Sequence, residues 1–291
     1  MDSQRVKLIA IVGPTASGKT QLAIDVAKKF DGEIICADSR TIYEGMDIGT
    51  AKPTKQERAE VMHHGLDLVS PDQSFSAAEF KDFTQKMVNQ ISSRGKIPIL
   101  VGGSGLYLWA FLYNYSFPAG ANSDYRKKLE EKDLAWLVEY LKEKDPLTHA
   151  VIDLKNKRRV IRAIETIGLL KTKKHSLPKG YRIIGLNPPM FELEARIATR
   201  TKKMLDQGLL EETAKIIGHY GNDIEILRTI GYAEVQQVIN GSYNLVKAIE
   251  MINLHTRQLA KRQLTWFKRS SDIEWFEDTT KAWSFVCSWF D

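Results

Sequence analysis

The sequence is poor in cysteine, with only Cys36 and Cys287 among 291 residues. Two cysteines exclude a disulfide framework and a multi-cysteine zinc site, and we expect Cys36, which lies in an apolar run, to be packed in the interior. No apolar run approaches the roughly 18 residues of a membrane-spanning helix, and the N-terminal residues MDSQRVK lack the apolar stretch of a signal peptide. We therefore expect a cytoplasmic protein without membrane attachment.

Acidic residues are nearly missing from two stretches of a chain whose formal net charge is +6. Residues 155–182 hold ten Lys or Arg and one acid, Glu165, for a net charge of +9, and residues 257–269 hold five positive charges and no acid. Solvated helix faces would explain such stretches, and so would an anionic partner such as a nucleic acid. Charge alone leaves both interpretations open.

Three short apolar runs predict buried strands, at residues 7–13 (KLIAIVG), 33–39 (EIICADS) and 97–103 (IPILVGG). Helical patterns separate them, and Ser76 with Glu79 forms a capping box that opens a helix running to about residue 94. Alternation of near-continuous apolar strands with helices is typical of a parallel sheet that is covered on both faces. We therefore predict the α/β fold class.

Residues 117–180 have helical periodicity and no strand signal, and the strand pattern returns only at residues 181–189 (YRIIGLNPP). We predict a P-loop parallel-sheet core made of residues 1–116 and 181–291 and covered by helices, with a small all-helical domain inserted at 117–180. In the second part of the core we expect a helix that Gly208 stops, further helices that Gly221 and Gly241 interrupt, and an edge strand at DIEWFE.

A phosphate-binding loop follows the first strand. The segment GPTASGKT matches G-x-x-x-x-G-K-[ST] and has a strand before it and a helix after it, which is the context of nucleotide-binding and ATP-binding loops. Its glycines let backbone amides turn toward phosphate oxygens, Lys19 adds a positive charge and Thr20 can bind Mg²⁺. The predicted phosphate site comprises Gly13, Pro14, Thr15, Ala16, Ser17, Gly18, Lys19 and Thr20.

Phosphate binding does not by itself mean nucleotide hydrolysis. The strand ending near Asp38 could supply an acid for Mg²⁺, but IPILVGG ends in glycines and no purine-reading motif is apparent. Because ligands bind beyond the carboxyl ends of parallel strands, residues 13–20, 38–41 and 102–107 should converge on one crevice. Asp38 is then a candidate catalytic carboxylate, although an Asp-Ser pair is also common in turns.

Five motifs in order resemble those of the tRNA dimethylallyltransferase family, the bacterial tRNA isopentenyltransferases. They are GPTASGKT, DSRTIYEGMDIGTAKP (38–53), LVGGSGLY (100–107), RTIGY (228–232) and TRQLAKRQLTWFK (256–268). The resemblance spans residues 5 to 280, and YxGMDIGTAKP is highly specific. It implies transfer of a dimethylallyl group from dimethylallyl diphosphate to the exocyclic amine, N6, of the adenine 3′ of the anticodon, at position 37 of tRNA.

The resemblance also implies roles for single residues. Asp38 falls on the family's general base, and Ser104 stands where the family usually has a Thr beside the same amine. Lys19, Thr20 and Arg228 match the groups that neutralise the leaving diphosphate, together with Mg²⁺ as cofactor. Positive groups there would lower the barrier, because charge accumulates on the diphosphate while the allylic carbon becomes cation-like.

For tRNA, the resemblance implies contacts with the anticodon stem-loop, held between the insertion and the core, by a protein that we expect to be a monomer. Residues 38–41 match the segment that contacts the target nucleotide, with Thr41 in place of the family's common Gln. Other matched spans are 158–162, 228–233 and 261–268, where we expect Val160, Ile161 and Leu264 to be core. The tRNA-binding residues expected are Asp38, Ser39, Arg40, Thr41, Ser104, Arg126, Arg158, Arg159, Arg162, Lys261, Arg262, Gln263 and Lys268.

Three alternatives remain at this point. An isopentenyltransferase acting on free adenine nucleotides would not need the +9 stretch or the basic segment KRQLTWFK. A small-molecule P-loop kinase would form ADP from ATP without prenyl transfer, and a non-catalytic RNA-binding module would not need GPTASGKT with Asp38.

Overall fold

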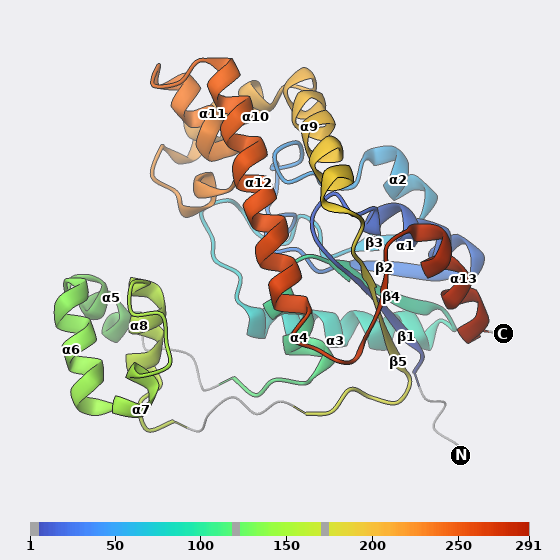
Figure 1. The fold of residues 1–291 in the computed structure, drawn as a ribbon, viewed down its shortest axis with the longest axis horizontal. Helices are drawn as coiled ribbons and strands as arrows, with labels where there is room; N and C mark the ends of the chain where they lie inside the picture. Colours follow the sequence, from blue (N-terminus) through green and yellow to red (C-terminus); the bar gives the residue numbers. More distant parts are fainter. Residues whose placement is uncertain (1–5, 118–122, 170–174, 291) are drawn as a thin grey trace. The chain divides into compact units, whose positions relative to one another are not determined.

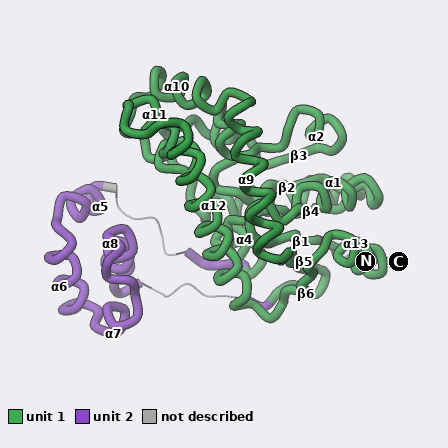
Figure 2. The backbone as a smooth tube through the Cα atoms, turned by 45° about the horizontal axis from the view of Figure 1, so that its top comes forward, with its two compact units in different colours: residues 1–113, 177–291 green, residues 114–176 purple. Residues whose placement is uncertain are grey.

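The computed structural model of the chain describes residues 6–117, 123–169 and 175–290. It divides into two compact units, unit 1 of residues 1–113 and 177–291 and unit 2 of residues 114–176 (Figure 2). Unit 2 thus begins at Asn114 rather than at residue 117 and ends at Ser176 rather than at residue 180. Within the described ranges, no helix is long and apolar enough to cross a membrane.

Unit 1 is built on a six-stranded sheet in which every neighbouring pair is parallel, in the order β3-β2-β4-β1-β5-β6. The strands are β1 (Leu8–Val12), β2 (Gly32–Cys36), β3 (His63–His64), β4 (Ile97–Gly102), β5 (Tyr181–Leu186) and β6 (Ile273–Phe276). The α/β prediction is confirmed, and DIEWFE supplies the edge strand β6. The two-residue strand β3 is an addition to the predicted sheet, at its other edge.

The helices of unit 1 come from both sides of unit 2 in the sequence. Those before it are α1 (Lys19–Lys29), α2 (Lys55–Glu60), α3 (Ala77–Ser93) and α4 (Gly105–Leu112). Those after it are α9 (Met190–Asp206), α10 (Leu209–Tyr220), the 3₁₀ helix η1 (Glu225–Arg228), α11 (Tyr232–Ile239), α12 (Leu245–Phe267) and α13 (Thr279–Phe290). Ser76 and Glu79 cap α3 reciprocally, as predicted, and α9 and α12 pack side by side (Figure 1).

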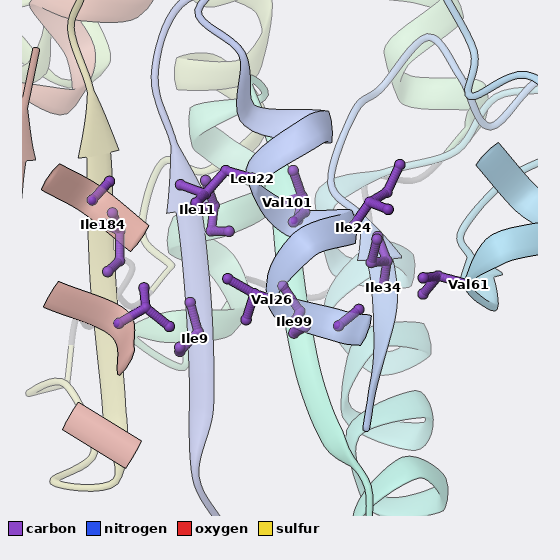
Figure 3. Packing of buried hydrophobic residues seen from close by; sticks show 14 of the residues in the cluster. Ile9, Ile11, Leu22, Ile24, Val26, Ile34, Val61, Ile99, Val101 and Ile184 are labelled. Carbon is purple, nitrogen blue, oxygen red and sulfur yellow. The ribbon is translucent and has the colours of Figure 1, made fainter. Parts of the chain in front are cut away.

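The core lies on both faces of the sheet. On one face, alternate residues of β1 and β4 point toward α1, so that Ile9, Ile11, Ile99 and Val101 meet Leu22 (Figure 3). The intervening strand positions, such as Leu8, Ala10 and Leu100, are fully buried as well. Burial on both faces explains why these strands read as continuous apolar runs rather than as alternating ones.

A second cluster joins the helices that follow β5 to the loop after β2. Ile42 and Met46 of that loop pack with Met204 of α9, Leu209 of α10 and Tyr232 of α11. These helices therefore fix the backbone just beyond the carboxyl ends of the strands, where parallel sheets hold their ligands.

Unit 2 is all helical in its described residues, with α5 (Ser123–Glu130), α6 (Leu134–Lys144), α7 (Pro146–His149) and α8 (Lys157–Glu165). Its core contains Leu129, Leu137, Leu141 and Ile164, and also Val160 and Ile161, which we expected to be buried. Asp133 and Asn156 cap α6 and α8 by accepting bonds from backbone N–H groups. The helical pattern read from the sequence therefore has its own small apolar core.

Candidate active site

A cavity of about 940 Å³ opens in unit 1 at the carboxyl ends of β1, β4 and β2, which are neighbours in the sheet. Loops after all three strands line it, with Thr15 after β1, Asp38 to Arg40 after β2 and Gly103 to Tyr107 after β4. Helices α9 and α12 supply further lining residues. The three segments that the sequence predicted to converge thus meet at one cavity.

The loop after β1 has the backbone of a phosphate cradle. Gly13, Ala16 and Gly18 have φ values of 141°, 64° and 93°, and a Cβ on Gly13 would collide with the Leu186 carbonyl. These positive φ values turn the loop back into the N-terminus of α1, where unpaired amides favour an anion. The buried Ser17 hydroxyl has no hydrogen-bond partner within the described residues.

Lys19 is the cation of this loop. Its Nζ donates to the Pro14 carbonyl at 2.6 Å. Burial lowers the pKa of Lys19 to about 8, the nearby Asp38 charge opposes the shift, and the Arg200 guanidinium adds to it. The lowered pKa indicates that Lys19 is desolvated and lies near another cation, Arg200, and a bound diphosphate would supply balancing negative charge.

Asp38 follows β2 by two residues and is anchored by its own turn. Its Oδ1 accepts the Arg40 backbone N–H at 2.8 Å. Burial raises the pKa of Asp38, while the Arg40 N–H and the charges of Lys19 and Arg200 act in the opposite direction. The turn-cap role and a catalytic role are therefore compatible, because one carboxylate oxygen serves the turn and the residue still lines the cavity.

Ser104 connects the loop after β4 to the Asp38 loop. Its Oγ accepts the Ser39 backbone N–H at 2.9 Å and lies 3.2 Å from the Ser39 hydroxyl. Its backbone N–H donates to the Ala37 carbonyl at 3.3 Å. Ser39, Ser104 and Asp38 consequently form one wall of the cavity.

Two arginines from the later helices also line the cavity. Arg228, at the end of η1, was a candidate from the sequence, whereas Arg200 of α9 was missed. Burial lowers the pKa of Arg200, and the Asp38 charge opposes that shift. The only sequence signal for Arg200 is its place one turn after Arg196 on a helix, a spacing that surface arginines share.

The motif between Tyr43 and Lys52 is fixed by the buried side chain of Lys52, which pairs with two partly exposed carboxylates. Lys52 Nζ is fully buried, donates to the Tyr43 carbonyl at 2.8 Å, and lies 2.6 Å from carboxylate oxygens of both Asp47 and Asp67. The Glu212 carboxylate accepts the N–H groups of residues 47, 48 and 49 at 2.9–3.0 Å. Because Gly49, Thr50 and Ala51 line the cavity, these bonds shape its wall.

The expected tRNA-binding residues of unit 1 divide into three groups. Those that line the cavity are Asp38, Ser39, Arg40, Ser104, Arg262 and Gln263. Lys261 and Lys268 are exposed on or just after α12. Thr41 is buried, and its hydroxyl donates to the Asp38 carbonyl at 3.4 Å. Leu264 is partly exposed rather than core.

In unit 2 the expected tRNA-binding arginines have unequal surroundings. Arg126 of α5 and Arg162 of α8 both pair at 3.3 Å with Glu165, whose side chain is 1% exposed. Arg159 is 65% exposed and lies 3.9 Å from Asp153. Arg126 and Arg162 thus join α5 to α8, which leaves them a structural task in addition to any contact with RNA. Lys171, Lys173 and Lys174 of the basic stretch lie outside the described residues.

The phosphate loop offers the Thr20 hydroxyl as a candidate metal ligand. Thr20 is exposed at the first turn of α1, and a hydroxyl oxygen is a hard donor of the kind that Mg²⁺ prefers. Within the described part of the chain, no group of three or more His, Cys, Asp or Glu residues could enclose a metal ion.

Comparisons with known proteins agree on one family. The family model described as IPP transferase matches residues 41–270. The curated tRNA dimethylallyltransferase of Oceanobacillus iheyensis is 43% identical over 283 residues, covering 93% of this chain and 90% of the relative. That of Anoxybacillus flavithermus is 40% identical over 282 residues, with coverages of 94% and 91%.

Solved structures give the same result. The full-length tRNA isopentenylpyrophosphate transferase of Bacillus halodurans matches with a TM-score of 0.73 and 37% identity, covering 97% of this chain and 96% of that one. A eukaryotic dimethylallyltransferase acting on tRNA matches with a TM-score of 0.79 and 28% identity, covering 93% and 73%. The fold and nearly the whole length of the chain are therefore shared with these enzymes.

Proposed function

The chain belongs to the IPP transferase family, and we propose that it transfers the dimethylallyl group of dimethylallyl diphosphate to N6 of adenosine 37 in tRNA, next to the anticodon. It is a prenyl-transferring enzyme that acts on tRNA, as its relatives are. The observation that carries the finer proposal is the cavity where a phosphate loop and Asp38 meet. A transferase acting on free adenine nucleotides is not favoured, because the similar proteins are named for tRNA.

The donor's diphosphate would bind at the N-terminus of α1. Lys19 supplies a positive charge that can move with the leaving group, and Arg200 and Arg228 supply two more in the cavity lining. Positive groups held in place before the reaction stabilise the charge that develops as the carbon–oxygen bond breaks. The prenyl chain has apolar neighbours in the cavity, among them Tyr107, Met204 and Ile252.

Asp38 would act as the general base. The N6 amine attacks the allylic carbon, the bond from that carbon to the diphosphate oxygen breaks, and the diphosphate leaves with the electron pair. The proton of the amine passes to the Asp38 carboxylate, because N6 is a poor nucleophile while its lone pair is delocalised into the ring. Ser104, fixed by Ser39, would hold the same amine through its hydroxyl.

Mg²⁺ is the metal that we propose for the donor site, with Thr20 as its protein ligand. When bound, it would neutralise charge on the diphosphate oxygens, and one hydroxyl ligand suits a metal that usually takes its other ligands from phosphates and water. The exposed position of Thr20 in the phosphate loop supports this assignment.

The anticodon stem-loop is the proposed tRNA partner. The target base must leave its stack to reach Asp38, at a cost of a few kcal/mol, and phosphate contacts elsewhere can offset that cost. Arg40, Lys261, Arg262 and Lys268 of unit 1 and the basic residues of α8 in unit 2 are the candidates for those contacts. We propose that the enzyme acts as a monomer, and that it acts in the cytoplasm because its substrate is tRNA.

A single assay tests the proposal. The protein is incubated with labelled dimethylallyl diphosphate, Mg²⁺ and either unmodified tRNA or AMP, and the label in each product is counted. We expect label in tRNA, and a loss of turnover of about 10²–10⁴-fold in Asp38→Asn, which keeps the shape but cannot accept the proton. tRNA binding by Asp38→Asn should stay near that of the wild-type protein.

Label in AMP alone would instead favour the free-nucleotide enzyme, and ADP formation from ATP without prenyl transfer would favour a kinase. Near-normal turnover by Asp38→Asn would remove Asp38 as the base.

A further inference from the structure

Gln263 of α12 joins two loops that come from different strands. Its Oε1 accepts the backbone N–H of Thr15 in the phosphate loop at 2.8 Å, and its Nε2 donates to the Gly103 carbonyl at 3.1 Å. Both ends of one amide are therefore engaged within the protein. The phosphate loop follows β1 and Gly103 follows β4. This amide therefore connects the loop proposed to bind the donor's diphosphate with the loop that carries Ser104, proposed to hold the acceptor amine.

Gly103 and Gly105, on either side of Ser104, have no side chain and so leave room for α12. A Cβ on Gly103 would collide with the Gln263 amide nitrogen, and a Cβ on Gly105 would collide with the Trp266 ring. Gln263 and Trp266 are three residues apart and so lie on the same face of the helix. Helix α12 is consequently pressed against both neighbours of Ser104.

Ser104 passes this constraint on to the Asp38 loop. Its hydroxyl accepts the Ser39 N–H, and its own N–H donates to the Ala37 carbonyl. A continuous series of contacts thus runs from Thr15 through Gln263, Gly103 and Ser104 to the residues flanking Asp38. Displacing reacting groups by about 1 Å can cost about 100-fold in rate, so a link of this kind matters for the distance between donor and acceptor.

We propose that Gln263 is a positioning residue that sets the distance between the diphosphate loop and the Ser104 loop. This inference rests on the proposed function, because it assigns those loops to the two reacting partners. It differs from a tRNA contact by Gln263, since both polar ends of the side chain already have intramolecular partners. Lys261, Arg262 and Gln263 are consecutive residues of α12, so the proposed role of Gln263 also connects these two exposed basic residues to the site of transfer.

The test compares Gln263→Leu with Gln258→Leu, a matched change at an exposed position of the same helix. For Gln263→Leu we expect kcat at saturating donor and tRNA to fall by about tenfold or more. Its Kd for tRNA, and the salt dependence of that Kd, should remain within about twofold of wild type, because no RNA contact is lost. Gln258→Leu should match the wild-type protein in both measurements.

Hydrogen exchange supplies a readout that does not depend on turnover. In the wild-type protein the Thr15 N–H is protected by Gln263, so a peptide containing residues 13–20 should exchange faster in Gln263→Leu and not in Gln258→Leu. Magnesium diphosphate, added as the probe, should bind the Gln263→Leu protein more weakly. If Gln263→Leu does not fold, Gln263→Asn is the second variant, since its shorter amide cannot reach both partners.

Two results would overturn the inference. A Gln263→Leu protein with wild-type kcat but weaker, less salt-dependent tRNA binding would make Gln263 an RNA contact. A lower melting temperature with wild-type kcat and unchanged exchange at 13–20 would make it a packing residue only. Failure of the proposed function is distinguishable from both, because then neither the wild-type protein nor Gln258→Leu would label tRNA.

Discussion

The pKa values of Lys19 and Asp38 are shifted toward each other, although the two side chains carry opposite charges and interact electrostatically. The ion pair alone would raise the pKa of Lys19 and lower that of Asp38. Burial outweighs it in both cases, so the pKa of Lys19 falls to about 8 and that of Asp38 rises. The free enzyme should therefore have both groups in their working forms only within a limited pH range.

The pH dependence of kcat/KM for the donor follows from these shifts. Activity should rise with pH as Asp38 loses its proton, with a midpoint above the usual value of about 3.9. It should fall again around pH 8, where Lys19 loses the charge that we propose binds the diphosphate. Measuring kcat/KM from pH 4 to 10 gives the two limbs of a bell, which report on the free enzyme.

Lys19→Arg is the matched control for the alkaline limb. A guanidinium keeps its charge over this pH range, so the fall near pH 8 should disappear in the variant. A fall of equal size in wild type and Lys19→Arg would assign that limb to another group.

At single residues, local motifs indicated which positions would lie near one another. Spacing or resemblance singled out GPTASGKT, Asp38 and Ser104, and Thr15 of that segment lines the cavity together with Asp38 and Ser104. Arg200 and the bridging bonds of Gln263 could not be found, because they depend on α9 and α12 meeting loops some 160 to 250 positions away in the sequence. Helical periodicity places such residues on a face but does not say what that face will touch.

Among the elements, the long and regular ones were predictable. The strands β1, β2 and β4 were predicted from apolar runs, and α3 was predicted from its capping box. The strand β3 could not be predicted, because it is two residues long and exists only through pairing with β2. His63 and His64 form that strand, and His64 lies 2.7 Å from the Glu33 carboxylate.

The arginines of unit 2 that were expected to bind tRNA are of two kinds, which the sequence could not distinguish. Glu165 is buried and pairs with both Arg126 and Arg162, so removing either partner should destabilise unit 2 by about 1–3 kcal/mol. Arg158 and Arg159 are the residues that we expect to bind tRNA phosphates.

The prediction is that Arg158→Ala with Arg159→Ala weakens tRNA binding and flattens its salt dependence. Each lost phosphate contact should reduce the slope of log Kd against log salt by roughly 0.7–0.9. Arg126→Ala is the comparison, and it should lower the melting temperature more than it changes the salt slope. An unchanged slope in the double variant would mean that the basic residues of α8 form a solvated face and do not contact tRNA phosphates.

For the whole molecule, the topology explains why residues from both parts of unit 1, before and after unit 2 in the sequence, line one site. Parallel pairing places β1, β4 and β2 side by side, and their loops supply the phosphate cradle, Ser104 and Asp38. The helices after β5 return over this edge with Arg200, Arg228 and Gln263. Unit 2, inserted between α4 and β5, folds around its own core and leaves that arrangement intact.

The proposed reaction requires this cavity to bring the donor's allylic carbon to the amine of one tRNA adenine. The most direct test is to treat an unmodified tRNA with dimethylallyl diphosphate and the enzyme, digest it with nucleases, and locate the added mass by mass spectrometry. We predict a single dimethylallyl group on N6 of adenosine 37, and none on a matched tRNA that carries guanosine at that position. A dimethylallyl group at another nucleotide, or equal labelling of the guanosine variant, would contradict the account.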